Sequence, residues 1–115
     1  FGKANKSSRT YEELVEKYQK KLADGGRATS KFIPKEISIS QKEELIDSVT
    51  YSVEKLIKHV QGYSESELDV LILPHPLLGK LTLREMLYFT IYHVGHHHII
   101  TRRIIDNVRS GANNT

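Results

Sequence analysis

Cysteine is absent from this 115-residue chain, which excludes a disulfide framework and any metal site built on thiolates. A bound metal would have to use histidine, carboxylate, backbone or water ligands. The chain also lacks an apolar run close to the ~20 residues that a membrane helix needs. No charged-then-apolar signal segment opens the printed sequence. We therefore expect a protein of the reducing cytoplasm with no membrane partner.

A strong excess of charge of one sign is missing as well. The 17 lysines and arginines face 14 acidic residues, for a formal net charge of +3, and they are interspersed as on an ordinary solvated surface. No module combining basic and aromatic residues is recognisable, so we expect no nucleic-acid partner. The chain length allows a single domain over residues 1–115, with three or four helices.

Three segments carry the pattern of an amphipathic helix with a capping box at its start and a glycine beyond its end. They span about 10–24, 41–61 and 83–109, and their capping pairs are Thr10 with Glu13, Ser40 with Glu43, and Thr82 with Glu85. We expect a long connection over residues 24–39 and a flexible tail over residues 110–115. Because no convincing strand is found, the sequence predicts an all-α, up-down helical bundle.

Two prolines punctuate the segment before the last predicted helix. Pro74 and Pro76 fix the backbone around His75, and Gly79 permits a tight turn before the next helix begins. Such a loop can pin one end of a bundle or form the rim of a pocket. The residue types leave both roles open for His75.

Four of the six histidines lie within residues 93–98, inside the longest predicted helix. An α-helix advances 100° per residue, so His93 and His97 lie one turn apart on one face and can present two ring nitrogens to one ion. The rest of their stripe is apolar, and we expect it to face the interior of the bundle. His96 lies to one side of the stripe, and His98 points away from it.

Spacing alone leaves two interpretations of the His93 and His97 pair open. Buried neutral imidazoles need partners for their ring nitrogens, and a divalent ion can be such a partner. Alternatively, His93 and His97 are core histidines satisfied by hydrogen bonds, or they belong to an interface cluster.

The last predicted helix is apolar over most of its circumference, which is typical of a helix that is central or borders a partner. We therefore also expect a homodimer.

The run from His75 to Met86, followed by Tyr92 to Ile99, resembles the DinB-like, YfiT-like superfamily of small helical metal proteins. Members carry an HP-x-x-G-x-x-T/S loop before a helix with HxxxHH or HxxHH, and this chain has both parts. The segment from Gly2 to Leu14 is also similar to the middle of such proteins. The resemblance implies a four-helix bundle with one bound divalent ion, nickel or zinc. It also implies a metal-dependent hydrolase or thiol-dependent transferase acting on a small molecule. The alternatives are a non-catalytic metal-binding, stress-related module and a helical dimerisation domain with core histidines.

The same resemblance implies three histidine ligands, two of which match His93 and His97. The third is expected upstream of Phe1, and because the chain does not begin with methionine we expect it to belong to a longer protein. His59 is the second choice for this ligand. Its predicted helix also faces the core, but His59 lies only at the edge of the apolar stripe of that helix. We expect His96 and His75 to support the ligands or line the pocket. No catalytic residue is predicted.

Overall fold

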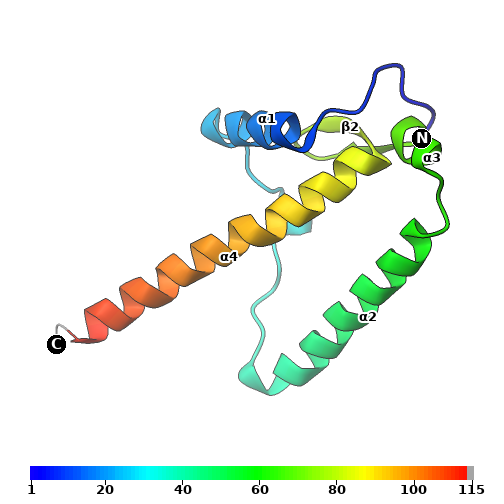
Figure 1. Ribbon diagram of the computed structural model, residues 1–115. Coiled ribbons are helices and arrows are strands. Elements are labelled where there is room, and N and C mark those ends of the chain that lie inside the picture. The colour runs from blue at the N-terminus through cyan, green and yellow to red at the C-terminus, as the bar shows by residue number, and fades with distance from the viewer. Residues whose placement is uncertain (114–115) are drawn as a thin grey trace.

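The computed structural model describes residues 1–113 as four α-helices, two short 3-10 helices and a two-stranded sheet (Figure 1). In chain order these elements are α1 (Tyr11–Ala23), η1 (Ser30–Phe32), η2 (Ile39–Gln41), α2 (Lys42–Val60), α3 (Glu65–Val70), β1 (Ile72–His75), β2 (Gly79–Thr82) and α4 (Leu83–Asn113). The two strands form an antiparallel hairpin. The prediction of an all-α, up-down bundle is therefore wrong.

The hairpin is built from residues that the sequence analysis assigned to a loop. Pro74 can occupy β1 because both strands of a two-stranded sheet are edges. Gly79 has a φ of 75°, a left-handed conformation that glycine adopts without strain. Four-residue strands, one of them with a proline, are too short for apolar alternation to reveal them.

Two of the three predicted capping boxes are confirmed. Thr10 and Glu13 cap α1 reciprocally through their side chains and backbone amides. At the start of α4, the backbone N–H of Thr82 donates to the Glu85 carboxylate, and the backbone N–H of Glu85 donates to the Thr82 hydroxyl. Local hydrogen bonds thus determine where these two helices begin.

The other two helices begin differently from the expectation. The predicted capping box of Ser40 and Glu43 is wrong, because η2 leads into α2 and Gln41 precedes it without a side-chain cap. The sequence analysis missed α3, whose own capping box pairs Ser64 with Glu67. A helix of six residues is too short for an apolar period to stand out.

The last helix, α4, is 31 residues long and continues past the predicted end at residue 109. It includes residues 110–113, which were expected to belong to a flexible tail, whereas residues 114 and 115 lie outside the described part of the chain. Gly111 falls inside the helix. A glycine within a helix costs about 1 kcal/mol relative to alanine but does not end it.

The core lies at one end of α4, where α1 and β2 meet it (Figure 1). Leu14 and Tyr18 of α1 form a buried cluster with Leu78 of the hairpin turn and Leu81 of β2. Partly buried residues pack against this cluster, namely Leu22, Leu77, Met86, Tyr88, Phe89 and Tyr92. These contacts position the first half of α4, and with it the histidines that follow.

The predicted place of α2 inside a bundle is also wrong. Every residue of α2 except Val60 is exposed, and its sustained contact is with η2. Figure 1 shows α2 separated from α4 along most of its length. Among the helices that the structure describes, none has both the length and the apolar character required to cross a membrane.

Candidate metal centre

One turn of α4 brings the rings of His93 and His97 together. Their Nε2 atoms are 2.9 Å apart, and their ring planes are nearly perpendicular, with centroids separated by 4.4 Å. This is a hydrogen-bond distance, so one neutral ring donates from Nε2 while the other accepts. Two nitrogens bound to one tetrahedral Zn²⁺ lie roughly 3.3 Å apart. If the two Nε2 atoms moved slightly apart, an ion could therefore bind between them in place of the hydrogen-bonded proton.

The surroundings of the pair keep His93 neutral. Burial lowers the pKa of His93 below its ordinary value, and the neighbouring His97 and His96 lower it further. A neutral imidazole retains a nitrogen lone pair that can bind a cation. His93 is partly buried and His97 is exposed, so the pair opens to solvent on the His97 side.

Tyr18 of α1 covers the other side of the histidine group. Its ring lies edge-on to His93 and His96, with centroid distances of 6.2 and 6.0 Å, and to Phe89 at 5.0 Å. Burial raises the pKa of the Tyr18 hydroxyl, and Tyr92 adds to the effect, so the hydroxyl stays protonated at neutral pH. Sequence reasoning missed this role. Helical spacing places Tyr18 on the apolar face of α1 but does not identify its neighbours on α4.

His96 flanks the pair, while His98 does not. The ring of His96 stacks on Tyr92 with centroids 5.9 Å apart, and it lies edge-on to His97 at 5.4 Å. This is a suitable position for a residue that lines the pocket or supports the ligands. His98 is exposed, and its position on the helix directs it away from His93.

His75 of β1 approaches the group through Phe89. The Phe89 ring lies 4.3 Å from the His75 ring and stacks on His93 at 4.9 Å, measured between centroids. Nδ1 of His75 accepts hydrogen bonds from the backbone N–H groups of Leu77 and Leu78, each 3.1 Å long. The proton of the neutral ring must then be on Nε2. In this tautomer His75 is a hydrogen-bond donor and not a metal ligand.

His59 lies on α2, outside the histidine group. Its Nδ1 is 2.8 Å from the carbonyl oxygen of Lys55, and because a carbonyl can only accept, Nδ1 donates and Nε2 keeps a free lone pair. This is the tautomer of a metal-binding histidine. However, α2 makes no sustained contact with α4 over the described residues. The structure does not bring His59 to His93 and His97.

The described part of the chain contains no group of three histidine, aspartate or glutamate side chains arranged to hold a metal. Glu85, an acid on α4, is buried and accepts hydrogen bonds from Thr82 and Arg9 instead. What the structure brings together on α4 is the pair of ring nitrogens of His93 and His97. The third histidine expected upstream of Phe1 stays a prediction.

No protein-family model matches this chain, and no curated protein and no solved structure is significantly similar to it. The resemblance to the DinB-like, YfiT-like superfamily thus depends on the HP loop and the histidine helix, and it stays a prediction. The structure establishes a mostly helical chain with a two-stranded hairpin. On its last helix, Nε2 of His93 and Nε2 of His97 point toward each other and lie 2.9 Å apart.

Proposed function

We propose that this chain binds one divalent cation, Ni²⁺ or Zn²⁺, through Nε2 of His93 and Nε2 of His97. The observation that carries the proposal is the 2.9 Å separation of these two nitrogens on one face of α4. The motif resemblance to the DinB-like, YfiT-like superfamily supports the same pair. The third ligand in this proposal is a histidine outside the described residues, placed upstream of Phe1 by the resemblance.

For the protein that contains this site, we propose a metal-dependent hydrolase or thiol-dependent transferase that acts on a small molecule in the cytoplasm. A bound ion with an open position lowers the pKa of a coordinated water or thiol toward neutrality. This chain contributes two groups that keep a proton, the Tyr18 hydroxyl and Nε2 of His75. The Tyr18 ring packs edge-on against His93, and the His75 ring reaches the pair through Phe89. Phe89 stacks on His93 and excludes water from that side.

Metal binding is tested by titrating Zn²⁺ and Ni²⁺ into untagged protein and measuring heat and histidine NMR signals. Because two imidazoles alone make a weak site, we expect this chain to bind with an affinity weaker than micromolar. His93→Ala and His97→Ala each abolish the signal. His98→Ala, which removes an exposed histidine of the same helix, leaves it unchanged.

Two results would contradict this proposal. If His98→Ala weakened binding as much as His97→Ala, the metal would be held by scattered surface histidines. If the wild-type chain bound more tightly than micromolar, a third ligand such as His59 or a residue of a second copy would already be present. Turnover of thiol and amide compounds, compared with His93→Ala, separates an enzyme from a non-catalytic metal-binding module.

A second candidate function, self-association, is favoured by the exposed area of the chain. The accessible surface is 9480 Å², whereas a compact protein of 13.2 kDa exposes about 6,400 Å². The excess of about 3,000 Å² far exceeds the ~800 Å² that each partner buries in a standard interface. The excess accompanies the unpacked α2 and the exposed apolar residues of α4. We propose that a second copy of this chain covers them.

The charges on these two helices suit such pairing. The start of α2 carries Glu43, Glu44 and Asp47, whereas the second half of α4 carries Arg102 and Arg103. Opposite charges beside two apolar stripes favour α2 of one copy against α4 of the other. Four helices from two copies would then enclose the stripes that one copy leaves exposed.

Sedimentation and light scattering at micromolar concentration test self-association. We expect a dimer mass for the wild type and a monomer mass for Val49→Glu/Leu56→Glu, which places two charges in the apolar stripe of α2. Tyr51→Glu is the matched control because Tyr51 is exposed on the opposite face of α2, and it should leave the dimer intact. A monomeric wild type would reject this proposal.

A further inference from the structure

A cavity of about 520 Å³ lies on the face of the hairpin opposite the histidines. Ile72 pairs with Thr82, and Lys80 lies opposite Pro74 on the same face. Ile72, Lys80 and Thr82 line the cavity together with the N-terminal segment of the chain. His75 pairs with Gly79 on the other face, toward Phe89. The hairpin thus separates this cavity from the proposed metal site.

The lining of the cavity is strongly cationic. Lys3, Lys6, Arg9 and Lys80 line it, and Glu85 is the one acid among the lining residues. Their excess of three positive charges equals the net charge of the whole chain. Among the described residues, none of the three lysines forms an ion pair. A multiply charged anion would relieve their mutual repulsion.

Glu85 does not neutralise the lysines, because its charge is already paired. The side chain is 4% exposed and accepts hydrogen bonds from the Arg9 backbone N–H at 3.1 Å and the Arg9 guanidinium at 2.9 Å. A third bond, from the backbone N–H of Thr82, is 2.8 Å long. Glu85 therefore acts as an anchor for the cavity wall and leaves the lysine charges available.

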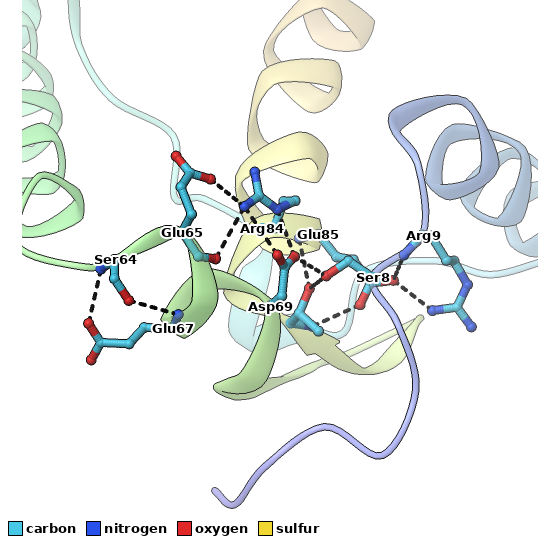
Figure 2. Close-up of polar contacts among 9 residues, drawn as sticks. Ser8, Arg9, Ser64, Glu65, Glu67, Asp69, Arg84 and Glu85 are labelled. Atoms are coloured by element: carbon cyan, nitrogen blue, oxygen red, sulfur yellow. Dashed lines mark hydrogen bonds and ion pairs between the residues drawn. The ribbon is translucent and has the colours of Figure 1, made fainter.

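The walls are held by contacts to the folded half of the molecule. The backbone of Lys3 bridges to Leu71, and the backbone N–H of Ala4 donates to the Val70 carbonyl at 2.7 Å. Figure 2 shows Ser8 and Arg9 reaching from the N-terminal segment to α3 and α4. The N-terminal wall is thus fixed before a ligand arrives, so binding orders little additional chain.

We propose that this cavity binds a small molecule through a phosphate group carrying two negative charges. The ammonium groups of Lys3, Lys6 and Lys80 act as point charges toward the phosphate oxygens. The cavity volume lies within the roughly 300–1,000 Å³ typical of small-molecule sites, so there is room for the rest of a phosphate monoester. Free phosphate and a phosphate monoester present the same chemistry to these lysines.

The proposal is tested by titrating inorganic phosphate, glycerol phosphate and glycerol into the protein in low-salt, phosphate-free buffer with a chelator. Binding is measured by calorimetry and backbone amide NMR shifts. We expect saturable binding of both phosphates, with shifts centred on residues 3–9 and 80–82, and no binding of glycerol. Tighter binding of glycerol phosphate identifies a monoester as the ligand, and equal or tighter binding of inorganic phosphate identifies the free ion.

Two double variants with the same change in net charge make the test local. Lys3→Gln/Lys80→Gln removes two cavity lysines and should weaken phosphate binding about tenfold, as expected for lost charge-assisted hydrogen bonds. Lys20→Gln/Lys21→Gln removes two exposed lysines of α1 outside the cavity lining and should leave the affinity unchanged. Both pairs are exposed, and circular dichroism checks that each variant folds.

Equal losses in the two double variants would overturn the proposal, because binding would then follow overall charge. A wild-type protein without saturable phosphate binding would overturn it as well. His93→Ala/His97→Ala should bind phosphate like the wild type, so failure of the metal site and failure of the phosphate site are distinguishable.

Discussion

The half of the molecule around the hairpin and the half formed by α2 and the second part of α4 use similar amphipathic helices with opposite outcomes. In the hairpin half, Leu14 and Leu81 are 1% and 0% exposed, whereas Val49 of α2 and Val108 of α4 are 55% and 66% exposed. The Cα radius of gyration is 17.4 Å, compared with about 13 Å for a compact domain of this length. An apolar stripe thus predicts an amphipathic helix, but it does not identify the element or the partner that packs against the apolar face.

The two halves also differ in how well they can hold a site. The proposed phosphate cavity belongs to the hairpin half, where backbone hydrogen bonds and the pairing of Arg9 with Glu85 fix the N-terminal wall. The proposed metal pair lies at the boundary, with His93 partly buried and His97 exposed. A site on a packed scaffold holds its geometry. The metal pair has such support at His93, against which Tyr18 and Phe89 pack, whereas His97 is exposed.

The comparison is tested most strongly by removing one leucine from each half. Leu81→Ala creates a cavity in the core and should lower the free energy of unfolding by about 2–5 kcal/mol. Leu56 of α2 is 43% exposed. Leu56→Ala should therefore change the free energy of unfolding of the monomer by less than about 0.5 kcal/mol. Urea denaturation at a concentration where the chain is monomeric measures both.

The same two variants also test whether a second copy of the chain covers α2. At concentrations where the chain is a dimer, Leu56→Ala should become destabilising, because stability then includes the interface. The effect of Leu81→Ala should not depend on concentration. If Leu56→Ala cost several kcal/mol in the monomer, α2 would be packed against its own chain, and the contrast between the two halves would be wrong.

Much of the helical structure could be predicted because its causes are local. The capping boxes at Thr10 and Thr82 act between residues three positions apart, and both are confirmed. Gly25, with a φ of 96°, follows α1 and lets the chain turn, as the glycine signal predicted. The closeness of His93 and His97 is likewise a consequence of the helical period.

The remaining features depend on contacts between residues far apart in the sequence. Leu81 pairs with Leu73 across the hairpin and is buried in one cluster with Leu14 of α1, and no local pattern records the contact with α1. Tyr18 could not be assigned to the histidine group until α1 was placed against α4. The exposure of α2 was missed because its apolar stripe is indistinguishable from that of a packed helix.

The last prediction is that His75 makes the stability of the hairpin half sensitive to pH. Burial lowers the pKa of His75 below its ordinary value of 6.5, so the unfolded chain takes up a proton at a pH where the folded chain does not. Stability present above about pH 6.5 should therefore fall as the pH drops through the lowered folded pKa, by at most about 1.4 kcal/mol per pH unit.

Urea denaturation between about pH 7 and pH 5, with a chelator present, measures this slope. His75→Asn removes the titrating ring while its side-chain oxygen can still accept from Leu77 and Leu78, so the slope should decrease. His59→Ala removes an exposed histidine of α2 and should leave the slope as it is. An unchanged slope in His75→Asn would show that protonation of His75 does not oppose folding. The two halves of the molecule would then differ in packing but not in this response to pH.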